Sequence, residues 1–377
     1  MKKNKRLSKE LRLVVFNFIP LAFFLFVCSF FFLVYPQETA KSVSQGIELC
    51  VSTVVPSLFP FMVLSQIFVS GAFCEKLSEK LGKLTSFLFS LSPLGFSVVL
   101  ISFVGGYPTG AIVARKLFED GKISKHDFRH LLLFAVNPSP AFAIGAVGSA
   151  MLFSKEVGII IFSSVVISSL VLGVFSKIVK TGGESGDSFS PKSVTVLKPF
   201  SRCVVESITE SGKSILFISF SILFFSAVLS IFDRLFPSKE LSMFFGALLE
   251  VTCGCKRCFE SYPAEIIAGI IGWGGLCTHF QIMREVILSG LQRSVFFVFR
   301  LLHGALSAVI CSFLLKLFKS AVPVFSSRVE AVAPSSGSCL AFSFCLIGMC
   351  IILMLGNNNI ISGSSAKAKK SDIEVEL

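Results

Sequence analysis

Polar side chains gather beside glycines and prolines inside apolar runs of this sequence. Seven of them could bind a small polar solute: Thr109, Asn137, Ser139, Glu250, Thr278, His279 and Gln281. Hydroxyl and amide groups both donate and accept hydrogen bonds, while a carboxylate or an imidazole can also hold a charge or a proton. Because an ionisable group is costly at membrane depth, Glu250 is a functional candidate by default. For His279, a role as a hydrogen-bonded packing residue is an equal alternative.

The neighbouring glycines and prolines predict broken helices. The break residues are Gly105, Gly106, Pro108, Gly110, Pro138, Pro140, Gly274 and Gly275. Proline lacks a backbone donor, so Pro138 and Pro140 should free the carbonyls of Phe134 and Val136. Thr109 and Thr278 are placed to cap the helices that restart after the breaks. Freed backbone groups at membrane depth need protein or water as partners, which favours a polar site; a kink that only allows close packing is the alternative.

The elements that must position these residues are membrane spans. Hydrophobic residues make up 53% of the 377 residues, charged residues make up 15%, and the mean hydropathy is +0.80. The hydrophobic share exceeds that of soluble domains, and the charged share falls below it. We therefore expect an all-α polytopic transmembrane protein with about eight crossings and re-entrant or broken helices. The net charge of +12 falls in short runs beside apolar stretches, without the patterns of nucleic-acid binding, so we expect no nucleic-acid partner.

Catalytic and metal-binding motifs have little support in the sequence. Cys253, Cys255 and Cys258 form a C-x-C-x-x-C pattern, which differs from the paired C-x-x-C spacing of zinc sites. We find no nucleophile elbow, Walker, Rossmann or H-E-x-x-H motif. We therefore expect no enzyme, no catalytic residue, no metal and no cofactor. The expected partners are the lipid bilayer and a small polar solute or ion.

The topology follows from charge and length. Residues 84–113 are too long for one upright helix, and both flanks are basic. The positive-inside rule then predicts a re-entrant hairpin with its tip at residues 92–95; a single tilted span is the alternative. If successive spans cross the membrane in alternating directions from this hairpin, both termini and residues 180–213 lie in the cytoplasm. This alternation also assigns Arg284, Arg293 and Arg300 to the cytoplasmic side.

The order of segments predicts two halves related by an inverted repeat. Residues 1–45 form a cytoplasmic tail and first span, 46–180 a first repeat, 181–213 a cytoplasmic linker, 214–318 a second repeat, and 319–377 a loop, last span and cytoplasmic tail. Each repeat contains a span, a re-entrant element, a glycine-interrupted crossing and a span. Secondary transporters with this order bind substrate at broken helices near the midplane. We therefore predict that Thr109, Asn137, Glu250, His279 and Gln281 surround one polar cavity.

A succession of motifs resembles the sporulation integral membrane protein family of the YlbJ type. The motifs are PSLFPF at 56–61, GYPTGA at 106–111, Asn137 with PAFAIGAVG at 140–148, LEVT at 249–252, GGLCTHFQ at 274–281 and LLHG at 301–304. The resemblance implies a bacterial inner-membrane protein of endospore formation with two nucleoside-recognition (Gate) domains, which correspond to the two repeats. The chain departs from the family pattern at Ile112 and at Pro138-Ser139.

Two functions follow from these patterns and from the resemblance. The preferred one is a transporter-like or channel-like protein of the cell membrane that moves a small polar solute. The alternative is a sporulation membrane assembly or structural factor that keeps the transporter architecture without transport.

Overall fold

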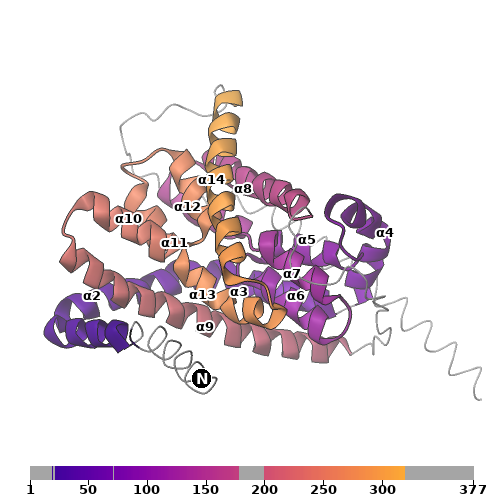
Figure 1. The fold of residues 1–377 in the computed structure, drawn as a ribbon, viewed down its shortest axis with the longest axis horizontal. Helices are drawn as coiled ribbons and strands as arrows, with labels where there is room; N and C mark the ends of the chain where they lie inside the picture. The colour runs from indigo at the N-terminus through magenta and orange to yellow at the C-terminus, as the bar shows by residue number, and fades with distance from the viewer. Residues whose placement is uncertain (1–18, 20–21, 71, 178–198, 319–377) are drawn as a thin grey trace, which may run out of the picture. The chain divides into compact units, whose positions relative to one another are not determined.

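The structure is a computed structural model that describes residue 19 and residues 22–70, 72–177 and 199–318. Within these residues every regular element is a helix (Figure 1). Five helices there are long and apolar enough to cross a membrane: Pro36–Phe68, Lys155–Phe175, Phe200–Leu235, Ala264–Ser289 and Arg293–Leu317. The predicted class, an all-α polytopic membrane protein, is confirmed. The predicted cytoplasmic tails, most of the linker and the last span lie outside the described residues.

The first half of the chain contains a helix over Ala22–Val34, followed by α2 (Pro36–Leu49), a π-helical turn (Cys50–Val54), α3 (Val55–Ser70), α4 (Ala72–Phe89), α5 (Gly95–Gly105), α6 (Thr109–Glu119), α7 (Lys125–Phe134), the π-helix η2 (Ala141–Met151) and α8 (Lys155–Phe175). The second half contains α9 (Phe200–Leu235), α10 (Lys239–Leu249), α11 (Val251–Cys258), α12 (Ala264–Trp273), α13 (Gly275–Ser289) and α14 (Arg293–Leu317).

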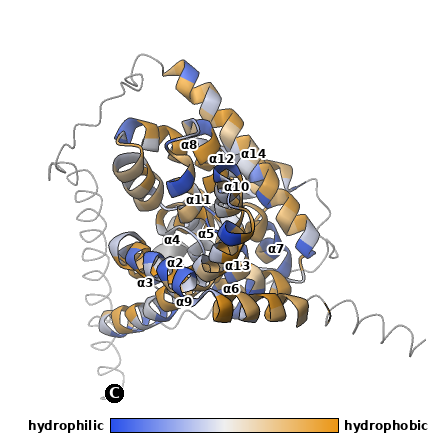
Figure 2. Ribbon diagram, turned by 90° about the vertical axis from the view of Figure 1, so that its left-hand side faces the viewer, coloured by the Kyte–Doolittle hydropathy of each residue, from blue (hydrophilic) through white to orange (hydrophobic). Residues whose placement is uncertain are grey.

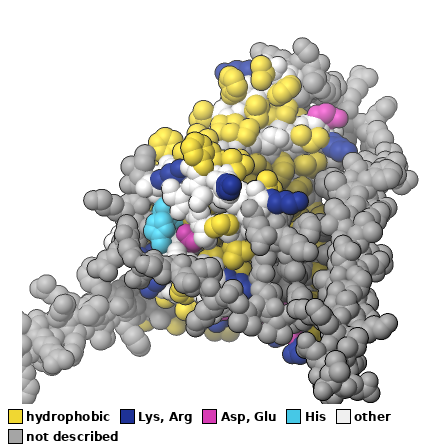
Figure 3. Space-filling view, turned by 90° about the vertical axis from the view of Figure 1, so that its right-hand side faces the viewer, with side chains coloured by type: hydrophobic (Ala, Val, Ile, Leu, Met, Phe, Trp, Pro, Cys, Tyr) yellow, Lys and Arg dark blue, Asp and Glu magenta, His cyan; other side chains and the backbone are white. Residues whose placement is uncertain are grey.

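Apolar side chains lie on the outside of the helices as well as between them. Figure 2 shows that hydrophobic residues make up most of the helices, and hydrophobic side chains also gather on the face drawn in Figure 3. Phe87, Phe220 and Phe313 are 79%, 64% and 63% exposed. Large apolar side chains on the surface of a soluble protein would mark an aggregation risk. On a polytopic protein they form the surface that lipid covers.

The interior is built on close crossings of α8, α12 and α14, which pack against one another. Small residues permit these crossings. A Cβ atom on Gly148 of η2 would lie 2.5 Å from the Cα of Gly158 in α8, and one on Gly272 of α12 would lie 3.0 Å from the Cα of Gly304 in α14. Glycine is therefore needed at both positions because backbone meets backbone there, as is common between membrane helices.

Two helical hairpins dominate the arrangement around the breaks. A Cβ atom on Gly110 of α6 would lie 2.6 Å from the Cβ of Ser102 in α5, whereas a straight helix would separate these residues by about 12 Å. Likewise, a Cβ atom on Gly254 of α11 would lie 2.5 Å from the Cα of Ala247 in α10. Thus α6 folds back on α5, and α11 folds back on α10.

The predicted hairpin segment, residues 84–113, contains two turns. The chain turns back at the predicted position, residues 92–95, where the hydroxyls of Ser78 in α4 and Ser97 in α5 lie 2.7 Å apart, and it turns again at the tip of the first hairpin, residues 106–108. Gly106 takes a φ of 71° there, a conformation that suits glycine. Hydropathy alone did not predict the second turn, because the apolar run continues through both turns. In the second hairpin the tip is Glu250, which separates α10 from α11.

Candidate functional site

The hairpin tips meet the breaks in the neighbouring helices. In the first half, a Cβ atom on Gly106 would lie 2.8 Å from the backbone nitrogen of Ser139, between α7 and η2. In the second half, a Cβ atom on Gly275, where α12 gives way to α13, would lie 3.1 Å from the Cα of Glu250. Each tip therefore touches the break of the following helix pair in its own half.

Tyr107 joins the two halves at this level. Its hydroxyl donates a hydrogen bond of 3.0 Å to the carbonyl of Ile271, near the C-terminal end of α12. Because Tyr107 belongs to the tip of the first hairpin, this bond connects the first hairpin with the break of the second half. The three predicted breaks and the hairpin tip at Glu250 thus form one cluster inside the described part of the protein.

Arg300 of α14 lies at the centre of this cluster and is fully buried. Its guanidinium donates hydrogen bonds to the carbonyl of Val136, at 2.7 Å, and to the carbonyl of Gly272. The Val136 carbonyl is one of the two that Pro138 and Pro140 were predicted to free. The other, at Phe134, accepts hydrogen bonds from Asn137 and Ser169. Side chains of the protein itself therefore satisfy the broken backbone.

The burial of Arg300 corrects its assignment to the cytoplasmic charges. It lies within an apolar helix, and charged groups in such positions mark functional sites by default. That signal was present in the sequence, because residues 294–317 form a span in which Arg300 is an interior charge. Arginine also suits the position chemically, since one planar guanidinium can donate to several acceptors at once.

A small cavity of about 40 Å³, whose mostly apolar wall carries several polar side chains, opens beside the hairpin tips. Four of the seven predicted solute-binding residues line it: Ser139, Glu250, Thr278 and Gln281. Tyr107 and Thr252 add hydroxyl groups, and the sequence analysis did not propose either one. Tyr107 directly follows the predicted break residue Gly106, and Thr252 lies two residues after Glu250. The cavity thus brings together polar groups from both halves of the chain.

Glu250 has the most defined geometry in the cavity. Its side chain is 2% exposed, and its carboxylate caps α11: Oε1 accepts from the backbone N–H and the hydroxyl of Thr252, both at 3.1 Å, and Oε2 accepts from the N–H of Cys253 at 2.7 Å. A helix N-terminus stabilises a negative charge placed in this way. A carboxylate has about four acceptor positions, so one remains available to a solute.

Three predicted residues lie behind the cavity wall. The Thr109 hydroxyl donates to the Gly105 carbonyl at 3.2 Å, the Asn137 amide donates to Ser102 and Phe134 at 3.0 Å each, and Nε2 of His279 lies 2.8 Å from the Trp273 carbonyl. All three are buried. Of the five residues predicted to surround one cavity, Glu250 and Gln281 line it, while the other three hold the broken backbone that supports it.

The two predicted threonine caps are corrected by the helix boundaries. Thr109 is the first residue of α6, and Pro108 precedes it at the N-cap. Thr278 is the fourth residue of α13, whose N-cap is Gly274. Gly274 and Gly275 have φ values of 85° and 76°, and α13 begins at Gly275. No side-chain cap is formed at the N-terminus of α6 or of α13. Thr278 lines the cavity instead.

Metal-binding geometry is absent from the described residues. No group of three or more His, Cys, Asp or Glu side chains in that part of the chain could hold a metal ion. Cys253, Cys255 and Cys258 are free thiols. The C-x-C-x-x-C pattern therefore reflects three positions on the short helix α11.

The fold and the cavity define a polytopic helical membrane protein in which two helical hairpins meet at a small internal cavity. The chain is similar to the sporulation integral membrane protein YlbJ of Bacillus subtilis (strain 168), with 22% identity over 337 residues, which are 78% of this chain and 82% of that protein. The relative's name describes an integral membrane protein and no enzymatic activity. No protein-family model matches the chain. No solved structure matches it either.

Proposed function

We propose that this chain is a transporter-like or channel-like protein of the cell membrane that acts in endospore formation and binds a small polar solute or ion between its hairpin tips. The similarity to a sporulation integral membrane protein supports the cellular role. We include in this proposal the two Gate-like repeats, residues 46–180 and 214–318. The name of these domains refers to nucleoside recognition.

The observation that carries the proposal is the shared cavity. Tyr107 from the first hairpin tip and Glu250 from the second line the same cavity. Membrane proteins tolerate non-helical backbone at membrane depth where it lines a cavity or is buried in protein. A protein that needed only to fill the membrane would gain nothing from a buried carboxylate between two broken helices, because ionisable groups are costly there.

The size of the cavity bears on the class of solute. Its volume of about 40 Å³ has room for about three water molecules, since each needs roughly 10–15 Å³. In this conformation the cavity therefore fits an ion or a few waters. A nucleoside would require the tips to separate, and separation of the two hairpins is the step that we propose for admitting a larger solute.

Uptake by proteoliposomes tests the proposal. The purified full chain would be reconstituted and screened with nucleosides, dipicolinate and small ions, with Glu250→Gln as the matched variant because it keeps the size of the side chain and removes its charge. We expect uptake of at least one class of solute by the wild-type protein and a loss of that uptake in Glu250→Gln. Wild-type vesicles that behave like empty vesicles for the whole panel would contradict transport.

An assembly or structural factor is the second candidate, and one observation favours it. Thr109, Asn137 and His279 direct their hydrogen bonds to neighbouring protein groups and not into the cavity. Such bonds stabilise a fixed architecture. If the transport panel is negative while Glu250→Gln leaves sporulation intact in a host that depends on this protein, the assembly role is favoured over transport.

A further inference from the structure

A second cavity, of about 280 Å³, lies on another face of the second hairpin. It is lined by polar residues of α2, including Ser42 and Gln45, by Ser226 of α9, and by Cys253, Lys256 and Arg257 of α11. The residues of α11 that line the first cavity are Val251 and Thr252. Helix α11 therefore separates the two cavities. The second one approaches the lower end of the size range of small-molecule pockets, which is about 300 Å³.

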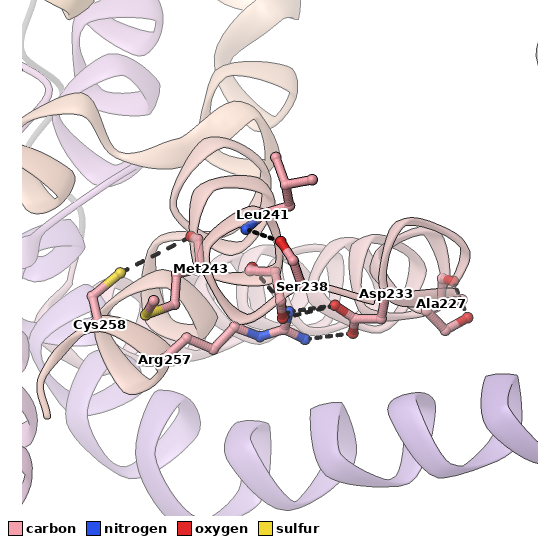
Figure 4. Close-up of polar contacts among 9 residues, drawn as sticks. Ala227, Asp233, Ser238, Leu241, Met243, Arg257 and Cys258 are labelled. Atoms are coloured by element: carbon pink, nitrogen blue, oxygen red, sulfur yellow. Dashed lines mark hydrogen bonds and ion pairs between the residues drawn. The ribbon is translucent and has the colours of Figure 1, made fainter. Parts of the chain in front are cut away.

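The cationic side of this cavity is fixed by an ion pair. The guanidinium of Arg257 donates to both carboxylate oxygens of Asp233, at 2.7 and 2.8 Å, and to the hydroxyl of Ser242 at 2.6 Å (Figure 4). This two-bond geometry orients the guanidinium and balances its charge. Lys256 is exposed, and no carboxylate of the described residues forms an ion pair with it. The lysine thus contributes an unbalanced positive charge.

Ser226 supplies an independent sign that the cavity holds a polar ligand. Its side chain is 4% exposed and lines the cavity, yet its hydroxyl has no hydrogen-bond partner among the described residues. A buried hydroxyl without a partner loses stabilisation. A Cβ atom on Gly46 of α2 would lie 2.8 Å from this hydroxyl oxygen, so glycine at that position leaves the space that the buried hydroxyl occupies.

We propose that the second cavity binds an anionic group, a phosphate or a carboxylate, through Lys256 and the hydroxyl of Ser226, with Ser42 and Gln45 as further hydrogen-bond donors. Asp233 and Glu250 are acids next to residues of this cavity, and Glu48 is an exposed acid of α2 that directly precedes the lining residue Leu49. Asp233 is engaged by Arg257, and Glu250 faces the other cavity, where backbone N–H groups hold it. The anionic group can belong to a soluble molecule or to a lipid headgroup. This binding does not depend on transport, because it can be measured on a protein that moves nothing.

Cys253 provides a native reporter inside the cavity. It is a free, partly exposed thiol, whereas the other described cysteines are buried. The test uses the full chain with Cys74, Cys339, Cys345 and Cys350 replaced by serine, in nanodiscs of phosphatidylcholine. Modification of Cys253 by a negatively charged and by a positively charged methanethiosulfonate reagent would be timed by mass spectrometry, with Cys253→Ser as the blank.

The variants separate a specific charge from a general surface effect. Cys253 is modified by the negatively charged reagent at one rate and by the positively charged reagent at another. We expect Lys256→Gln to lower the ratio of the first rate to the second about three- to tenfold, which is the effect expected for one charge at short range near water. Lys239→Gln, an equal charge change on the exposed start of α10, should leave the ratio unchanged. A Ser226→Ala variant should weaken the protection that an anion gives to Cys253.

Protection of Cys253 identifies the source of the anion. Slower modification in the presence of inorganic phosphate or acetate would assign the site to soluble anions. Slower modification in phosphatidylglycerol nanodiscs, without an effect of phosphate or acetate, would assign it to a lipid headgroup. Either result supports the proposal. An unreactive Cys253, a charge ratio that is the same in Lys256→Gln and wild type, or an absence of protection by every anion and lipid would overturn it.

Discussion

Arg300 shows how a single side chain can hold two distant breaks in a membrane protein. It contacts Val136 in the first half and Gly272 in the second, which are far apart in the sequence. Because both acceptors are backbone carbonyls at helix breaks, the guanidinium replaces hydrogen bonds that the broken helices cannot make. A buried cation with this task stabilises one arrangement of the two halves and would have to exchange partners if the halves moved.

Replacing Arg300 should therefore destabilise the protein. Arg300→Gln leaves at least one carbonyl without its donor, and a buried unsatisfied group costs about 1–3 kcal/mol. We expect the midpoint of thermal unfolding in detergent to fall by roughly 5 °C. Arg300→Lys should give a smaller decrease, because an ammonium group lacks the planar fork but keeps the charge. Arg284→Gln, a change at an exposed arginine, is the control, and an equal midpoint for all variants would contradict the assigned role.

Glu250 combines two tasks that different substitutions can separate. Alanine removes the cap of α11, which should lower the free energy of unfolding by about 1–2 kcal/mol. Glutamine keeps one oxygen as an acceptor, so Glu250→Gln should reach the membrane at near wild-type levels while it loses solute binding. Membrane abundance and binding of the solute found in the uptake screen would be measured together. Binding that survives in Glu250→Gln would show that the charge is not used.

At the scale of elements, the positions of the helix breaks could be predicted and their three-dimensional form could not. Glycine and proline act locally, so the breaks near residues 106, 138 and 274 follow from residue type. The hairpin tip at residues 106–108 depends on packing of α6 against α5, which leaves no trace in hydropathy. The same limit explains the capping errors: Thr109 and Thr278 have suitable side chains, but the preceding residues decide where each helix begins.

The crossing of η2 and α8 offers a test with a control in the same helix. A Cβ atom on Gly148 would lie 2.5 Å from the Cα of Gly158, whereas one on Gly145 would have no atom within 4 Å. Gly148→Ala must push two backbones apart, and overpacking of this kind costs about 1–3 kcal/mol. We expect a lower unfolding midpoint and less protein in the membrane for Gly148→Ala. Gly145→Ala should equal or slightly exceed the wild type. Equal losses in both variants would show that the crossing is not close-packed.

At the scale of the whole molecule, the two halves place like parts around one cavity. Each half supplies a hairpin, a broken helix pair and a long helix, α8 or α14, and these two long helices pack against each other. Hydropathy and the order of breaks led to the prediction of two repeats, which stays a prediction. They could not predict which residues face each other across the cavity, since Tyr107 and Arg300 reach their partners only after the chain has folded.

The inverted relation of the halves remains a prediction, and the bases of the two hairpins test it. If the halves are inverted, the first hairpin enters from the cytoplasm and the second from outside. Asp120 and Glu260 are exposed residues at the two bases. On a cysteine-depleted background, an impermeant maleimide added to intact cells should label Glu260→Cys and spare Asp120→Cys, which should react after permeabilisation. Cysteines placed at either terminus or within residues 180–213 should behave like Asp120→Cys. Labelling of both bases from outside would show that the hairpins enter from the same side and that the repeat is not inverted.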